Sequence, residues 1–255
     1  MIMKKLVTVF AACAIAGLAM AVDSNIVGYI TKTTDANKMD ILGMSFQEIG
    51  GADLNVQDIL LEGADPYGGT DILRVWNPQT AKYTYAIYFN DTYADYDYDP
   101  DLGPGWADAD QIRFDFTIPA GQGFWLTTSG NASATIAGEV LAKTDNKVST
   151  DANKMDILSN TFPVDANVQD VKFVSGADPY GGTDILRVWN PQTAKYTYAI
   201  YFHDTYADYD YDPDLGAGWA DADQIRLDFS ILAGQGFWLT TTGNAVVEFV
   251  APAAL

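Results

Sequence analysis

The chain has 255 residues, with 14 lysines and arginines against 34 aspartates and glutamates, and its formal net charge is −20 at neutral pH. Such an acidic surface repels nucleic acid and anionic membranes, which excludes both as expected partners, and it attracts divalent cations or cationic partners or simply keeps the protein soluble. One cysteine and one histidine are too few for Ser-His, Cys-His or histidine-based zinc sites.

The first 21 residues have the pattern of a secretory signal peptide. Lys4 and Lys5 precede an apolar run, residues 6–20, which is too short to span a bilayer and ends in small residues at Ala21. The alternative is a lipid anchor on Cys13, but the chain stays apolar for eight residues beyond that cysteine. We therefore expect a secreted protein with no membrane span, located outside the cell, at the cell surface or in the periplasm. Cleavage would leave a formal charge of −22 and no cysteine.

Most of the chain is a tandem repeat. Residues 63–128 return as residues 176–241 with five substitutions, at a constant offset of 113. The phrase DANKMDIL occurs at Asp35 and again at Asp151, so each repeat begins well before residue 63. Identity over this length indicates two near-identical units, each large enough for a core of its own.

Short strands separated by glycine, proline and asparagine run through each unit. The strands expected in the first unit are residues 25–31, 38–46, 71–76, 83–89, 111–116, 124–128 and 134–140. Asn55 and Asn167 each precede a short segment that could form one helical turn. The pattern predicts an all-β protein of two tandem antiparallel β-sandwich domains with near-identical sequence. Residues 22–142 form the first domain and residues 143–255 the second, after the signal peptide of residues 1–21, and we expect each to fold independently.

The clearest hairpin joins residues 71–76 to residues 83–89 through a turn that contains Pro78. Alternation along the returning strand places Tyr83, Tyr85 and Ile87 on one face and Thr84, Ala86 and Tyr88 on the other. Core packing accounts for most of the aromatic residues. If the tyrosine face is exposed, however, it could stack on sugar rings, and the candidate carbohydrate-binding residues are Tyr83, Tyr85, Tyr196 and Tyr198.

An acidic loop follows this hairpin in both units. No lysine or arginine lies between Lys82 and Arg113, and aspartates occupy alternate positions. Aspartate oxygens are the hard ligands that Ca²⁺ prefers, although the spacing lacks the glycine and glutamate of an EF-hand. A solvated acidic loop without metal is the alternative. The candidate calcium ligands are Asp95, Asp97, Asp99, Asp101, Asp208, Asp210, Asp212 and Asp214.

Several short phrases resemble a family of secreted bacterial β-sandwich proteins of uncharacterised role. They are NIVGY at residues 25–29, ILSNTF at 157–162, the tryptophan-containing strand at 72–76, PAGQGFW at 119–125 and GEV at 138–140. Members of that family read NxVGY, a phrase like LISNPF, PGxGFW and GEV. The resemblance covers nearly the whole mature chain and implies the fold and export more than an activity.

These observations favour a non-enzymatic structural or adhesive protein, stabilised by calcium and able to associate with itself. Self-association would use the lead strand, residues 25–31, which could pair with a neighbouring molecule or else complete its own unit. Binding of polysaccharide is the main alternative. A glycoside hydrolase is a second alternative, because paired carboxylates serve that chemistry, but nothing in the sequence suggests the apolar pocket that raises the pKa of a catalytic acid.

The acidic loops generate the first testable prediction, that millimolar calcium raises the melting temperature of the mature protein relative to chelator. Neighbouring carboxylates repel one another by about 1 kcal/mol per close pair in water, and one divalent ion would relieve several such pairs. Binding to the folded state alone must stabilise it. Differential scanning fluorimetry measures the shift, and identical melting temperatures in calcium and chelator would identify the loops as merely solvated.

Overall fold

The computed structural model describes residues 26–66, 68–90, 104–142, 144, 146–203 and 216–251. Within these ranges the protein is all-β, as the sequence predicts, and its named strands pair antiparallel. None of the helical segments in these ranges has the length and apolar character needed to cross a membrane. The expected signal peptide lies outside the described residues.

In its described residues the first unit carries eleven strands, of which the longest belong to its two main sheets. They are β1 (Val27–Thr34), β2 (Met39–Gly43), β3 (Phe46–Gln47), β4 (Leu54–Asn55), β5 (Ile59–Glu62), β6 (Ile72–Asn77), β7 (Lys82–Phe89), β8 (Gly105–Ala107), β9 (Thr117–Ile118), β10 (Gly123–Thr127) and β11 (Ala132–Val140).

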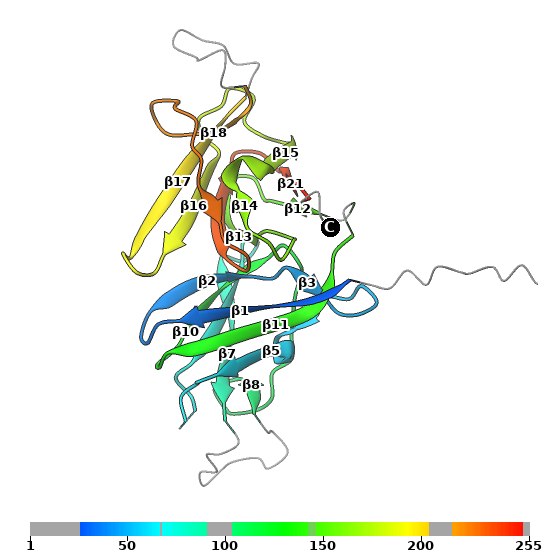
Figure 1. Cartoon of the computed structure of the whole chain (residues 1–255), viewed down its shortest axis with the longest axis vertical. Coiled ribbons are helices and arrows are strands. Elements are labelled where there is room, and N and C mark those ends of the chain that lie inside the picture. Colours follow the sequence, from blue (N-terminus) through cyan, green and yellow to red (C-terminus); the bar gives the residue numbers. More distant parts are fainter. Residues whose placement is uncertain are drawn as a thin grey trace, which may run out of the picture.

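The second unit repeats this order with a shorter lead strand and without an equivalent of β3 in the described residues. Its strands are β12 (Lys147–Ser149), β13 (Lys154–Ser159), β14 (Ala166–Asn167), β15 (Val171–Ser175), β16 (Ile185–Asn190), β17 (Lys195–Phe202), β18 (Gly218–Ala220), β19 (Ser230–Ile231), β20 (Gly236–Thr241) and β21 (Val246–Phe249). The two units are stacked along the long axis of the molecule (Figure 1).

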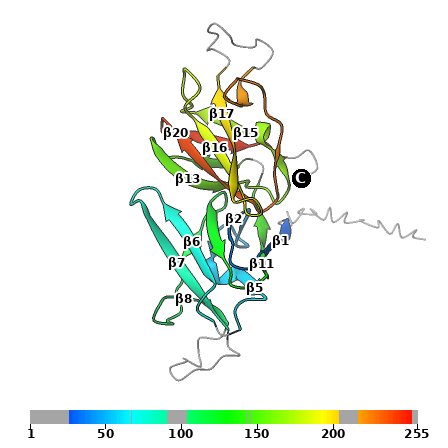
Figure 2. The same ribbon diagram turned by 90° about the vertical axis from the view of Figure 1, so that its left-hand side faces the viewer.

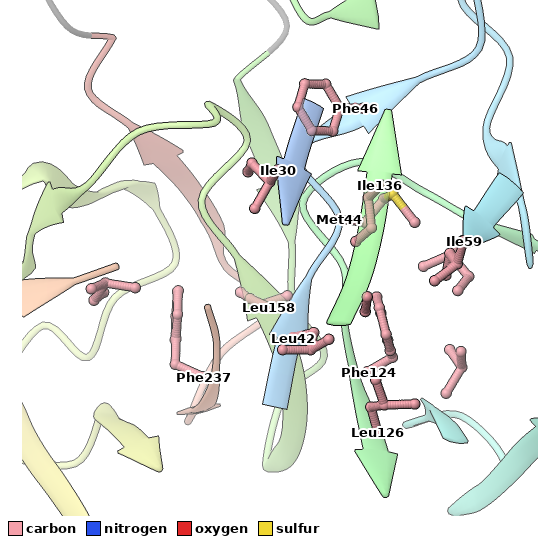
Figure 3. Packing of buried hydrophobic residues seen from close by; sticks show 14 of the residues in the cluster. Ile30, Leu42, Met44, Phe46, Ile59, Phe124, Leu126, Ile136, Leu158 and Phe237 are labelled. Carbon is pink, nitrogen blue, oxygen red and sulfur yellow. The ribbon is translucent and has the colours of Figure 1, made fainter. Parts of the chain in front are cut away.

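Each unit contains a five-stranded sheet and a smaller sheet. The five-stranded sheets have the order β2-β10-β6-β7-β8 and β13-β20-β16-β17-β18. In the smaller sheet of unit 1, β11 pairs with β1 on one side and with both β3 and β5 on the other, and in unit 2 the order is β12-β21-β15. The buried core lies between the two sheets, with Ile30 and Ile136 facing Leu42 and Phe124 (Figure 3).

The lead strand completes its own unit. β1 pairs with β11 over its whole length, from Val27 opposite Glu139 to Thr34 opposite Ala132. This is the intramolecular arrangement that the sequence left open beside exchange with a neighbouring molecule. β1 is nevertheless the end strand of its sheet, so association through its outer edge stays a prediction.

Local signals in the sequence predict the turns well. Asn55 caps a single 3₁₀ turn, Val56–Asp58, by accepting the backbone N–H of Gln57 at 2.9 Å, and Asn167 does the same for Val168–Asp170. The asparagine side chain replaces a missing backbone acceptor at the start of the turn, as expected.

The predicted strand at residues 111–116 is wrong. The Asp108 carboxylate accepts the backbone N–H groups of Asp110 at 2.9 Å and Ile112 at 3.0 Å, and Gln111 has a φ of 61°. The N–H groups of Asp110 and Ile112 are thus bonded within the turn and cannot pair with a neighbouring strand. Ile112 is also 64% exposed, so its side chain does not belong to the core. Alternation of apolar residues was therefore misleading here, because it coincided with an irregular segment.

The two units pack together through equivalent residues. The indole N–H of Trp76 donates to the carbonyl of Met155 at 2.7 Å, and that of Trp189 donates to the carbonyl of Met39 at 2.8 Å. Exchanging the two units converts one of these hydrogen bonds into the other. The junction therefore has the self-complementary geometry of a two-fold dimer. Ile41, Trp125, Ile157 and Trp238 form the buried apolar cluster at its centre.

Close approach of the units requires glycine at two matching positions. A Cβ at Gly123 would lie 2.5 Å from Cγ2 of Ile157, and a Cβ at Gly236 would lie 2.5 Å from Cγ2 of Ile41. The buried core continues across this contact, since Leu42 of unit 1 and Leu158 and Phe237 of unit 2 belong to one cluster (Figure 3). Independent folding of each unit stays a prediction, but the shared core implies that each stabilises the other.

We predict that Ile157→Ala, a substitution in unit 2, destabilises the whole protein by about 2–4 kcal/mol, because it leaves a cavity in the cluster shared by both units. Urea unfolding followed by tryptophan fluorescence should show one transition at a lower midpoint. Ile49→Ala is the control, because Ile49 is 75% exposed and its loss should cost less than about 0.5 kcal/mol. Two unfolding transitions, of which the substitution shifts the midpoint of only one, would contradict the shared core.

Candidate functional site

The four tyrosines singled out in the sequence lie on exposed faces of the five-stranded sheets. Tyr83 and Tyr85 belong to β7 and are 41% and 47% exposed, while Tyr196 and Tyr198 belong to β17 and are 42% and 50% exposed. Their strand neighbours Ala86 and Ala199 point inward and are fully buried. Alternation along the strand therefore separates the core from an outward tyrosine face in each unit.

Register aligns these tyrosines with other large side chains on the same face. In unit 1, Tyr85 is opposite Arg74 of β6, and Arg74 is opposite Trp125 of β10. In unit 2, the corresponding row across the sheet consists of Tyr198, Arg187 and Trp238. We call the outward sides of the two five-stranded sheets, with these rows, the tyrosine face.

Six aromatic rings connect the two halves of the tyrosine face across the junction. Neighbouring ring centroids are 4.9, 6.2, 6.4, 6.1 and 4.9 Å apart along the series. The rings, in order, are Tyr83, Trp76, Trp238, Trp125, Trp189 and Tyr196. The palindromic spacing follows from the two-fold relation of the units, and the packed rings hold the two outer tyrosines in fixed positions.

Tyr83 is anchored more firmly than Tyr85. Burial against its neighbours raises the pKa of Tyr83, while a hydrogen bond with the Trp125 side chain acts in the opposite direction. Tyr85 takes part in none of the ring contacts of the aromatic series. Tyr83 and Tyr196 therefore belong to the framework of the junction, whereas Tyr85 and Tyr198 are the members most accessible to a ligand.

The hairpin tips of the two units hold the junction from either side (Figure 2). The Gln79 amide, in the turn between β6 and β7, donates to both carboxylate oxygens of Asp151 at 2.7 and 2.6 Å. In the matching turn of unit 2, the Gln192 amide donates to Asp35 at 2.6 Å. Hydrogen bonds from Lys38 and Gln192 lower the pKa of Asp35. These reciprocal bonds fix each hairpin relative to the other unit.

A cleft of about 570 Å³ with both polar and apolar walls lies between the units beside the β16–β17 hairpin. Its wall includes the Trp189 ring, Thr31, Lys32, Asp40 and Gln192. Burial raises the pKa of Asp40, and a hydrogen bond from the backbone N–H of Ile41, followed by the charge of Lys32, partly offsets this effect. Hydroxyl, amide and carboxylate groups beside an aromatic ring are suited to a polyhydroxylated ligand.

The candidate calcium ligands lie outside the described residues, so calcium binding by the loops stays a prediction. Of the neighbouring aspartates that are described, Asp108 and Asp221 each accept two backbone N–H groups of their own turn. Within the described ranges, no three histidine, cysteine, aspartate or glutamate side chains come together as a metal site.

The sequence identified the tyrosines of this site but not their partners. Alternation along each strand puts Arg74 and Trp76 on one face of β6, just as it puts Tyr83 and Tyr85 on one face of β7. That these two faces coincide follows only from the pairing register. Apart from the duplication, nothing in the sequence indicates that Trp76 contacts Trp238 across the junction.

Comparison of the chain with known protein families, with curated proteins and with solved structures finds no match. The resemblance to secreted β-sandwich proteins therefore stays a prediction.

The buried Asp156, which corresponds to Asp40 in unit 1, generates a pH prediction. Burial raises its pKa from 3.8 to about 6, although its carboxylate accepts the backbone N–H of Asp151 at 3.1 Å. The folded state thus binds a proton more tightly than the unfolded state does. This contribution to stability is complete below about pH 4 and is lost as the pH rises through 6.

Asp156→Asn should therefore stabilise the protein at pH 7 by about 1–3 kcal/mol and have little effect at pH 4, because the amide can still accept the Asp151 N–H without carrying a charge. Denaturant unfolding at both pH values measures the difference from wild type. The exposed Asp53→Asn makes the same change in net charge and serves as control. An equal effect of Asp156→Asn at the two pH values would refute the assignment.

Proposed function

We propose that the protein is an exported, non-enzymatic adhesion protein of two tandem β-sandwich units, which binds polysaccharide through its tyrosine face. The observation that carries the proposal is the exposure of Tyr85 and Tyr198 beside a rigid aromatic series built by both units. Fold stability alone does not require these two rings, since the inward faces of the same strands already form the core.

The chemistry of these side chains suits carbohydrate. A tyrosine ring offers an apolar surface for the C–H face of a sugar and a hydroxyl at its rim for hydrogen bonding. Such binding needs rings that are fixed before the ligand arrives, because ordering them on binding would cost free energy. Tyr83 and Tyr196, two residues away on the same strands, meet this requirement through their packing against tryptophans.

Duplication supports an adhesive role over a catalytic one. Two equivalent tyrosine pairs on one rigid body can hold a repeating polymer at two points, and the second contact then forms at high effective concentration. In the described strands of the five-stranded sheets, the outward positions carry no aspartate or glutamate. The paired carboxylates of a glycoside hydrolase would therefore have to come from elsewhere.

A purely structural protein that polymerises through the edge of β1 is the second candidate. The observation that favours it is the exposed apolar end of that strand, where Val27 is 61% and Tyr29 is 74% exposed. The two candidates differ in what they bind, because the first needs a polymer of sugars and the second needs only another copy of the chain.

The test is retention of the mature protein by insoluble polysaccharides. We predict retention by at least one polymer, and the double variant Tyr85→Ala, Tyr198→Ala should bind it at least tenfold more weakly, a loss of about 1.4 kcal/mol. Tyr29→Ala removes an exposed tyrosine from the other sheet and should bind as wild type does. Retention that survives the double variant would contradict the assigned face.

If no polysaccharide retains the protein and it polymerises in solution, the structural candidate replaces the proposal. Analytical ultracentrifugation of wild type and of a variant that lacks residues 26–29 distinguishes this case, since only the full-length β1 edge would support assembly.

A further inference from the structure

The tyrosine face carries one charged residue in each unit, and both are arginines. Arg74 lies between Tyr85 and Trp125 in the register of β7, β6 and β10, and Arg187 lies between Tyr198 and Trp238 in the equivalent row. Cross-strand neighbours have Cβ atoms about 5 Å apart, so each arginine side chain leaves its strand between two aromatic residues.

These arginines stand apart from the acidic character of the chain. Aspartate and glutamate outnumber lysine and arginine by 34 to 14. Along the described strands of the two sheets, however, the outward residues are apolar, aromatic, hydroxyl-bearing or arginine. In the described part of the chain, no carboxylate pairs with Arg74 or Arg187. A cation kept free of carboxylates in such an acidic protein points to an anionic ligand.

The guanidinium groups are held in place with donors to spare. Nη1 of Arg74 donates to Thr127 Oγ1 at 3.0 Å, and Nη1 of Arg187 donates to Thr240 Oγ1 at 3.0 Å. Each side chain is half-buried. A guanidinium has five N–H donors, and the bond to threonine uses one of them, so a fork of donors remains for a planar acceptor.

We infer that the ligand of the tyrosine face is an acidic polysaccharide built from uronic acids. The sugar ring would stack on Tyr85 or Tyr198, and its carboxylate would accept two hydrogen bonds from the neighbouring arginine. Arginine suits this role better than lysine, because its planar fork matches a carboxylate and tolerates stacking beside aromatic rings. This inference rests on the proposed function and names the class of polymer that the face recognises.

The overall negative charge of the protein does not prevent such binding. Repulsion between exposed charges is largely screened beyond about 8–10 Å at physiological ionic strength, whereas the arginine acts at contact distance. The surrounding charge instead discourages non-specific adsorption of acidic polymers. Affinity for uronate should consequently depend on the two arginines and very little on other basic residues.

Affinity electrophoresis of the folded mature protein tests the inference, with soluble polymers cast into native gels. Polygalacturonate and alginate are the uronate probes, carrageenan is the sulfated probe, and dextran and xyloglucan are the neutral probes. Chelator is present throughout, so that calcium cannot bridge aspartates of the protein to the polymer. We expect retardation by at least one uronate polymer, with an affinity at least tenfold above that for the other probes.

The double variant Arg74→Gln, Arg187→Gln should lose at least tenfold in uronate affinity. Lys82→Gln, Lys195→Gln removes the same charge from exposed positions at the start of β7 and β17, and should keep the affinity. Thermal unfolding checks that both variants fold. Should the arginine variant fail to fold, Arg74→Lys, Arg187→Lys keeps the charge and removes the fork, and it too should weaken binding.

Each remaining outcome decides the question. Binding of neutral polymers without preference for uronate overturns the inference and leaves the proposed function standing. Preference for carrageenan overturns the assignment to carboxylate. Uronate binding that the arginine variants leave intact also overturns it, because the acid would then be recognised elsewhere. Retention by none of these soluble polymers or by the insoluble ones refutes the proposed function itself.

Discussion

The arrangement of the tyrosine face depends on the packing of one unit against a near-copy of itself. Trp76 and Trp189 each insert into the opposite unit and donate to its backbone, and the tryptophan rings between them close the gap. Because the two units have near-identical sequence, each of these contacts occurs twice, once from each side. The same side chains therefore form the interface, pack against Tyr83 and Tyr196, and link the two halves of the tyrosine face.

This arrangement gives the two faces of a β-strand different tasks. In β7, the inward residues Ala86 and Tyr88 belong to the core, and the outward residues either join the junction or face solvent. Tyr83 and Tyr85 are two positions apart, yet one packs on Trp76 and the other remains accessible.

Charge is divided in a comparable way. Acidic residues outnumber basic ones in the chain as a whole. On the outward faces of the described strands of the five-stranded sheets, however, the charged residues are arginines. At the margin of the junction, carboxylates are used as hydrogen-bond acceptors, as in the bond from Gln79 to Asp151. Asp156 also accepts a backbone N–H, but it is buried, and desolvation raises its pKa. Val148 occupies the position that Lys32 holds beside Asp40 in unit 1.

The sequence by itself determined the duplication, the all-β class, the β6–β7 hairpin and its two faces, because those features follow from local identity, strand periodicity and turn residues. It failed at residues 111–116, where a carboxylate cap competes with the strand ladder. Tertiary structure alone decided which faces meet, because register and the two-fold contact bring together residues far apart in the chain. Trp76 and Trp238 look like ordinary core residues in the sequence, and only the packing of the units places them beneath an exposed tyrosine surface.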